Sequence, residues 1–406
     1  MASRIRVLKN GIQNYPWGSR TAIAELLGAP NEDNRPQAEL WMGAHPLAPS
    51  QMICEDGLVG LDAAIDAAPE EILGGRVAAA FSNKLPFLFK VLAAAEPLSI
   101  QAHPNAQQAR EGFERENRAG IPLSAFHRNY RDDNAKPEMI CALTPLWALR
   151  GFRRIESIPP LLERLAGRSL REELAALRKK PDREGLKRFF HALMSMPEEK
   201  KRGALAEAAE IASRSANRDP VCHWVVKLSQ RYPGDIGTLC PALLNLVRLE
   251  PDEALYLPAG ELHAYLEGVG VEIMANSDNV VRGGLTTRHI DVEELLRILT
   301  FESRDVEILA PRPSENGEKV WPAPAPEFRL SIVEVGPAVW YESARLRSVE
   351  ILLCVGGEAR ITEGESGQPT PLRKGVSMVV PAVLHSYRIE GEARIFKASV
   401  PLDAIP

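Results

Sequence analysis

The chain has 406 residues, of which 45% are hydrophobic and 25% charged, and this length predicts roughly two or three globular domains. The net charge of -5, with both signs mixed along the chain, argues against a nucleic-acid partner. The five cysteines are scattered without a CxxC pair, and no apolar run reaches the roughly 18 residues of a membrane helix. We therefore expect a cytoplasmic protein with reduced thiols and no membrane partner.

Short strands and helices alternate in the first part of the chain. Residues 5–8 predict a strand, TAIAELLG predicts a helix that Gly28 ends, and residues 58–73 predict a helical stretch. The strand-like segment AELWMGAHP carries His45, which such a setting makes structural more often than chemical. In the next strand, Lys90 stands inside the apolar run of residues 87–92. Burying its ammonium group is costly without an anion nearby, so we expect Lys90 to have a function.

Polar and apolar residues alternate in the segment LSIQAHP. A period of two places Ser99, Gln101 and His103 on one face of a strand, and a glutamine and a histidine two positions apart can reach the same ion. Asn105 and Gln108 beyond it predict a helix that starts with a capping box. A polar, solvent-facing strand is the alternative interpretation.

Two further segments carry candidate ligands. In NAKPEMICAL, Lys136 and Glu138 are again two positions apart on a strand. Residues 255–288 contain a Pro-x-Gly turn followed by His263, then Glu272 on a strand and Arg282 after the polar turn SDN. A histidine behind such a turn suits a metal ligand, although a buried core histidine is the alternative. Together, Gln101, His103, Glu138 and His263 form a mixed nitrogen and oxygen set that suits zinc or a similar divalent ion.

The composition changes twice in the second half of the chain. From residue 155 to about 232, leucines recur at helical spacing among Ala, Glu, Arg and Lys, which predicts an inserted helical domain. After the proline-rich segment WPAPAPEF, short alternating strands predict a β-sandwich or jelly roll. There, GVSMVVPAVLHSYRI echoes LYLPAGELHAYLEG and places His385 as His263 is placed, but no Gln-x-His strand accompanies it. We expect this jelly roll to be free of metal.

Three segments together resemble type I phosphomannose isomerases (mannose-6-phosphate isomerases), which are zinc enzymes of the cupin class: LPFLFKVLAAAEPLSIQAHP, NYRDDNAKPEMICAL and HAYLEGVGVEIMANSDNVVRGGL. The resemblance covers nearly the whole chain. It implies a mainly β fold of two cupin-type jelly-roll domains with an inserted α-helical domain. The implied domains are a catalytic jelly roll (1–154 plus 233–302), a helical insertion (155–232) and a C-terminal metal-free jelly roll (303–406).

The resemblance also implies an activity: the interconversion of mannose 6-phosphate and fructose 6-phosphate through a cis-enediol, with one zinc ion per chain. Its implied metal ligands are Gln101, His103, Glu138 and His263. Its implied catalytic residues are Arg282, Lys136, Asp278 and Glu272, and its implied substrate-binding residues are Lys90, Ser99 and Arg288. The partner is then a sugar phosphate, and we expect a monomer or weak homo-oligomer.

The chain departs from the family pattern in two places. Ala135 stands where the family usually has the histidine of NHKPE, and RAGLTPK is replaced by RGGLTTR, so that Gly283, Thr287 and Arg288 differ. Arg288 keeps a cation, with a geometry different from that of lysine. These departures leave open a catalytically impaired, sugar-phosphate-binding regulator. A cupin dioxygenase and a purely structural double jelly roll are less favoured alternatives.

The implied reaction moves a proton between two neighbouring carbons. The site must then polarise two oxygens and supply a base, and zinc would supply the polarisation. Lys136 could shuttle the proton if the metal lowers its pKa, and Asp278 and Glu272 are rival bases. The sequence leaves the choice among the three open.

Overall fold

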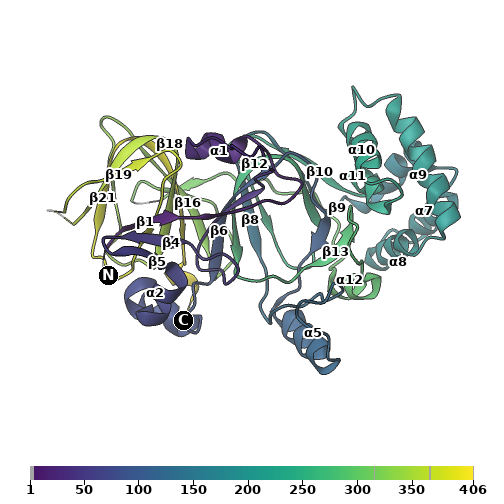
Figure 1. Ribbon diagram of the computed structural model, residues 1–406. Helices are drawn as coiled ribbons and strands as arrows, with labels where there is room; N and C mark the ends of the chain where they lie inside the picture. Colours follow the sequence, from purple (N-terminus) through teal and green to yellow (C-terminus); the bar gives the residue numbers. More distant parts are fainter. Residues whose placement is uncertain (1–3, 315, 365–366, 406) are drawn as a thin grey trace.

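The computed structural model describes residues 4–314, 316–364 and 367–405, and three parts follow one another along its length (Figure 1). A central β-structure lies between a bundle of helices at one end and a second β-structure at the other. The fold is mainly β, with two jelly-roll domains and an inserted helical domain, as predicted. The boundaries at residues 154, 232 and 302 stay a prediction.

The central β-structure is an antiparallel sheet with ten strands in the described part of the chain. Its strands are β2 (Gly11–Gln13), β3 (Glu39–Met42), β6 (Phe87–Ala94), β7 (Ile100–Ala102), β8 (Glu138–Ala142), β9 (Leu146–Phe152), β10 (Leu244–Leu249), β11 (Ala254–Leu257), β12 (His263–Ala275) and β13 (Val281–Gly284). Strand β12 is its hub, because it pairs with β6, β7, β8 and β9. All eight residues of β6 are buried, which explains its nearly continuous apolar sequence.

The second sheet has eleven strands among the described residues and joins the two ends of the chain. Its strands are β1 (Arg6–Lys9), β4 (Gln51–Cys54), β5 (Gly57–Gly60), β14 (Arg312–Pro313), β15 (Lys319–Val320), β16 (Arg329–Val335), β17 (Tyr341–Glu342), β18 (Glu350–Glu363), β19 (Thr370–Arg373), β20 (Ser377–Val380) and β21 (Tyr387–Ser399). Strand β1 pairs with β20 on one side and with β4 on the other. Strand β1 therefore pairs with the C-terminal jelly roll on one side and with the β4 and β5 hairpin on the other.

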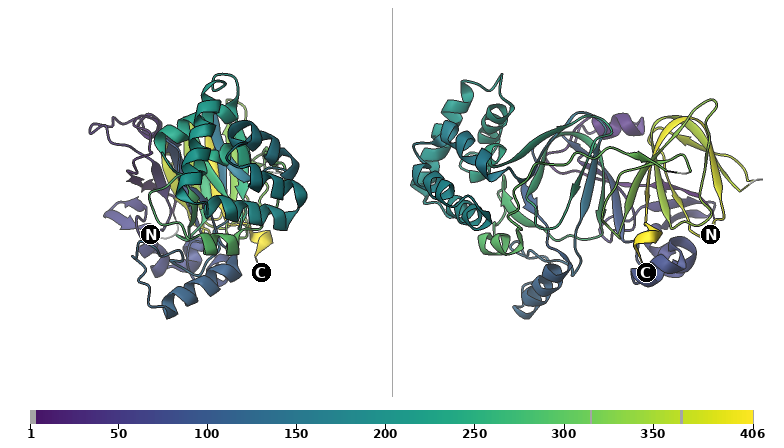
Figure 2. Two further views of the ribbon diagram at one scale, coloured as in Figure 1. Left: turned by 90° about the vertical axis from the view of Figure 1, so that its right-hand side faces the viewer. Right: turned by 180° about the vertical axis from the view of Figure 1, so that it is seen from behind.

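Six helices between β9 and β10 form the insertion and cover one end of the sheets (Figure 2). They are α6 (Ile158–Ala166), α7 (Arg171–Lys179), α8 (Arg183–Met194), α9 (Glu198–Ser213), α10 (Pro220–Arg231) and α11 (Cys240–Leu243). Leu162, Leu165, Leu174 and Leu177 of the predicted leucine pattern are buried in one core with Phe152 of β9. The helices thus cover apolar residues at one end of the central sheet.

The remaining helices lie outside the insertion. They are α1 (Ala22–Leu27), α2 (Leu61–Ala67), α3 (Pro69–Leu73), α4 (Gly75–Ala80), α5 (Ala106–Arg118) and α12 (Val292–Ile298), with the 3-10 turn η3 (Leu402–Ala404). The 3-10 turns η1 (Ile155–Ser157) and η2 (Ile236–Leu239) lie between β9 and β10. The predicted capping box of α5 is confirmed, since Asn105 and Gln108 bond to each other's backbone N–H. No helix in the described ranges is long and apolar enough to cross a bilayer.

The helix predicted for residues 58–73 is wrong at its start. Residues 57–60 form β5, which pairs with β4 as a hairpin, and the helical part begins at Leu61 and breaks at Ala68. The dipeptide Asp56-Gly57 at the turn is a strong hairpin signal. The backbone of Gly57 has a φ of 123°, which a glycine adopts without strain.

Candidate metal centre

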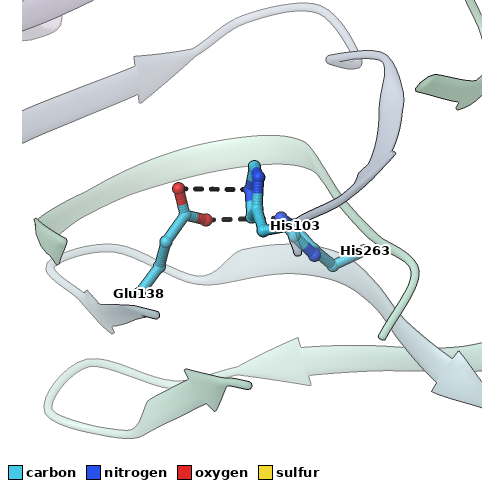
Figure 3. Close-up of side chains that lie close together, drawn as sticks. All are labelled: His103, Glu138 and His263. Atoms are coloured by element: carbon cyan, nitrogen blue, oxygen red, sulfur yellow. Dashed lines mark ion pairs between the residues drawn. The ribbon is translucent and has the colours of Figure 1, made fainter. Parts of the chain in front are cut away.

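Three buried side chains from different strands meet inside the central jelly roll (Figure 3). His103 directly follows β7, Glu138 opens β8 and His263 opens β12. The hub strand sets their positions, because His263 is opposite Gln101 of β7 and Met274 is opposite Glu138. One ligand atom from each of the three lies within 4.8 Å of the others.

The spacing of these atoms fits a small divalent cation. Glu138 Oε1 lies 3.4 Å from His103 Nε2, and Glu138 Oε2 lies 3.3 Å from His263 Nε2. Bonds of 2.0–2.1 Å in a tetrahedral zinc site place neighbouring ligand atoms about 3.3 Å apart. Both Nε2 atoms and Glu138 Oε2 are buried without a hydrogen-bond partner among the described residues. Buried polar atoms are normally paired, so this set fits a bound metal ion.

The backbone holds both imidazoles in the orientation that a metal needs. His103 Nδ1 lies 2.7 Å from the carbonyl oxygen of Asn279, and His263 Nδ1 lies 3.1 Å from that of Glu261. A carbonyl can only accept, so each Nδ1 carries the hydrogen and each Nε2 presents its lone pair to the centre.

The ionisation states also suit metal binding. Burial lowers the pKa of His103 to about 4, although Glu138 works against this shift, so the ring is neutral at pH 7. Burial acts to raise the pKa of Glu138, but the charge of the Lys136 ammonium acts against it, and that pKa lies well below its usual value. Two imidazoles and one carboxylate are a common zinc ligand set.

The turns around the centre are fixed by buried polar groups. The side chain of Asn279 is fully buried and bonds to the backbone of Arg131, Asp132 and Asn134, which anchors the carbonyl that orients His103. Gly260 donates its N–H to the carbonyl oxygen of His103 at 2.9 Å. Its φ is 76°, and a Cβ there would lie 2.8 Å from the oxygen of Ile298. Glycine is therefore required in the predicted Pro-x-Gly turn.

Two predicted site residues, Lys90 and Glu272, meet beside the three candidate ligands. Lys90 on β6 and Glu272 on β12 face each other in register, with Nζ 3.2 Å from Oε2. Tyr265 donates its hydroxyl to Glu272 Oε1 at 2.9 Å. Glu39 lies 3.7 Å from the same ammonium and accepts a hydrogen bond from Trp41 Nε1. Tyr265 and Glu39 were not predicted as site residues, although Glu39 and Trp41 alternate along one strand.

Charge fixes the state of this cluster. Burial alone would lower the pKa of Lys90, but Glu39 and Glu272 outweigh it and raise that pKa, so Lys90 is a permanent cation at neutral pH. Burial raises the pKa of Glu272, with Lys90 acting against it. Lys136 is a second buried cation, and its Nζ lies 3.2 Å from Glu138 Oε1. The buried anions of the site are thus matched by lysines.

Asp278 lies at the edge of the site, with its side chain 37% exposed. Its Oδ1 is 3.4 Å from Nε2 of the buried His45, whose ring packs edge-on against Trp41. Burial would raise the pKa of Asp278, but the hydrogen bond and charge of His45, with Lys136 and Arg131, lower it. His45 therefore has a place next to the site, as a partner of Asp278.

Three arginines, Arg282, Arg288 and Arg131, gather around β13. Arg282 stands opposite Gln101 on β7, and burial together with the nearby Arg288 and Arg131 lowers the pKa of Arg282 to about 10. Within the described part of the chain, no ion pair involves any of the three arginines. Arg288 and Arg131 are exposed, and Ser99 is half-buried just before β7. Arg131 was not predicted, because it is an exposed arginine in a polar loop.

Comparison with known proteins decides the family. Residues 5–155 match the catalytic domain of phosphomannose isomerase type I, and residues 162–244 match its helical insertion domain. The chain is 41% identical to "Mannose-6-phosphate isomerase" of Escherichia coli (strain K12), over 96% of this chain and 97% of that protein. The chain belongs to the type I phosphomannose isomerase family.

More distant relatives and solved structures agree with this family. The mannose-6-phosphate isomerase of Homo sapiens is 34% identical, over 94% of each chain. A zinc-bound crystal structure of a mannose 6-phosphate isomerase aligns with a TM-score of 0.89 and 39% identity, over 98% of this chain and all of that one. A crystal structure of a mutant phosphomannose isomerase from Salmonella typhimurium aligns with a TM-score of 0.90, 39% identity and the same coverage. Membership of this family sets aside the cupin dioxygenase and the purely structural double jelly roll.

Proposed function

We propose that this family member is a zinc-dependent aldose-ketose isomerase that interconverts mannose 6-phosphate and fructose 6-phosphate through a cis-enediol. The unpartnered Nε2 atoms of His103 and His263 on either side of the Glu138 carboxylate carry the proposal. The E. coli and human relatives are named for this reaction, and a solved relative holds zinc. We assign one zinc ion to the three residues, with Gln101 as the fourth ligand because it lies opposite His263 in the sheet.

Zinc supplies a Lewis acid that polarises the two sugar oxygens, and the protein supplies the rest. Lys136 lies beside the ligand carboxylate and is the group best placed to hold a proton next to the reacting carbons. Both oxygens of Glu272 are engaged, by Tyr265 and Lys90, so we assign it to positioning unless substrate displaces one of them. Asp278, with its lowered pKa, remains the rival base.

We place the phosphate at the arginine cluster of Arg282, Arg288 and Arg131. No ion pair of these guanidinium groups is present among the described residues, and arginine binds phosphate through paired N–H groups. Replacing Arg131 by Met should raise the KM for fructose 6-phosphate several-fold with little change in kcat, because the group contacts only the non-reacting end. An unchanged KM would remove Arg131 from the phosphate site. We assign Lys90 and Ser99 to the sugar between the phosphate and the metal.

One assay with metal analysis tests the function. The protein as purified should contain about one zinc per chain and should convert fructose 6-phosphate to mannose 6-phosphate in a coupled assay. A zinc-loaded chain that binds fructose 6-phosphate without turning it over would be the impaired regulator that Ala135 and Thr287 left open. Removal of the zinc should abolish activity, and its return should restore it.

We further propose a cytoplasmic enzyme that acts as a monomer or weak homo-oligomer and has no nucleic-acid partner. All five cysteines are free thiols, which suits a reducing compartment. Size-exclusion chromatography with light scattering measures the assembly state directly.

A further inference from the structure

The C-terminal jelly roll contains a buried cluster with the same chemistry as the tyrosine, carboxylate and lysine cluster beside the metal centre. Tyr387 donates its hydroxyl to Glu350 Oε2 at 2.8 Å, and Lys397 Nζ lies 3.2 Å from Glu350 Oε1. The side chains of Glu350 and Lys397 are only 3% and 5% exposed. Burying such a pair in a sheet interior costs desolvation energy, so its presence calls for an explanation.

The two clusters also occupy matching places in the chain. Tyr265 is the last residue of the segment PAGELHAY and Tyr387 is the last residue of PAVLHSY, in each case two positions after a histidine. That histidine is the buried metal ligand His263 in the first jelly roll, whereas His385 is exposed in the second. The C-terminal jelly roll thus keeps the polar cluster while its histidine points to solvent.

A cavity of about 410 Å³ adjoins the C-terminal cluster. Its lining has four cationic side chains and three carboxylates. Lys397 is matched by Glu350 and by Glu318, whose Oε2 lies 2.5 Å away, and Arg329 is paired with Asp403. The volume falls in the range of pockets that hold small molecules.

Arg347 is the charge in this lining that its neighbours do not satisfy. Its side chain is 4% exposed, and its closest carboxylate oxygen, on Glu350, is 3.7 Å away. One N–H of the guanidinium binds the carbonyl oxygen of Leu384, and the group lies over the ring of Tyr387. Nε and Nη1 have no hydrogen-bond acceptor in the described part of the chain. A buried arginine with two free donors in the wall of a cavity suits an anionic group.

We propose that this cavity is a second ligand site, separate from the zinc site, for a small polyhydroxylated anion such as a sugar phosphate or a sugar acid. The anionic group binds Arg347, and the carboxylates of Glu318 and Glu350 accept hydrogen bonds from the hydroxyl groups. None of the residues proposed for catalysis lines this cavity, so ligand binding there is a property additional to the isomerase activity.

Hydrogen-deuterium exchange on the whole zinc-loaded protein locates such binding. The segments 344–348 and 400–403 contribute residues to the cavity lining outside the long strands, so their amides report on its occupancy. Fructose 6-phosphate or gluconate should slow their exchange at saturation, and the pair of probes tells a phosphate from a carboxylate. Neutral fructose should leave their exchange unchanged. If neither anion slows exchange in these segments, the proposal is wrong.

Two kinds of variant test the contacts. Arg347→Met should raise the anion concentration needed for half-maximal protection about tenfold or more, because hydrogen bonds to a charged group are lost. Leu346 lines the mouth and is 77% exposed, so Leu346→Glu should repel the anion without disturbing the core, whereas Leu346→Gln is the uncharged control of the same shape. Equal affinity in the Leu346→Glu and Leu346→Gln proteins would overturn the proposal. The isomerase turnover of the Leu346→Glu and Leu346→Gln proteins should equal that of the wild type, which keeps this test separate from that of the zinc site.

Discussion

Replacing Tyr265 by Phe tests whether the buried cluster around Glu272 supports catalysis. The tyrosine is 2% exposed, and its hydroxyl donates to Glu272 Oε1 at 2.9 Å. Burial and the charge of Glu272 raise the pKa of Tyr265 well above its usual value, so the hydroxyl stays a donor at any working pH. The variant removes one atom and leaves a buried carboxylate oxygen without its donor.

The expected cost follows from that contact. A hydrogen bond to a charged group is worth about 1.5–3 kcal/mol, and no solvent reaches Glu272 to replace it. For a folding unit of this size, that loss lowers Tm by roughly 3–12 °C. If the same bond holds Glu272 in place for the reaction, kcat/KM should also fall roughly tenfold or more.

Tyr387→Phe is the matched control, because Tyr387 is 1% exposed and donates to Glu350 at 2.8 Å in the other jelly roll. Calorimetry should show a similar loss of stability in both variants, whereas the coupled assay should show a loss of activity only for Tyr265→Phe. Equal kcat/KM in the two variants, at similar losses in Tm, would refute a role of the Glu272 cluster in the reaction.

Three further predictions concern the metal and the proton. His263→Ala should lose zinc and activity while its circular dichroism stays near that of the wild type, because the large cores lie elsewhere; full activity in metal-free protein would contradict the zinc assignment. His385→Ala should keep its zinc and turnover, since this side chain is exposed, and a large loss of zinc would mean that the ion lies in the other jelly roll. Turnover in heavy water should place some deuterium on the product carbon, because a proton held on Lys136 or a rival base can exchange before its return. A complete lack of deuterium, with near-normal rates for variants of the three candidate bases, would indicate a hydride shift.

Local patterns predicted much of the site. The alternation around Gln101 and His103, the capping box at Asn105 and the turn at Gly260 each depend on neighbouring residues, and the structure contains all three. The position of Lys90 within an apolar strand also predicted a nearby anion, and Glu272 lies opposite it.

Interactions between distant segments could not be read in the same way. Nothing local to Glu39 shows that it shares an ammonium with Glu272, and nothing near Arg131 shows that Arg282 lies close by. Likewise, the pairing of β1 with β20 depends on a register between segments at opposite ends of the chain. Such contacts follow from the assembled sheets, where one hub strand sets the positions of four others.

The position of β1 has a consequence for the order in which the protein forms. On the ribosome, residues 6 and 7 emerge long before residues 378 and 379 of β20, with which they pair. Until then, β1 pairs only with the hairpin of β4 and β5 on one side, and its other edge has no partner strand. Contacts at such sequence separation are slow to close, and an open strand edge can pair with other chains. Strand β1 is therefore made early but completed late, and this late closure is the step at which a chaperone would be of most use.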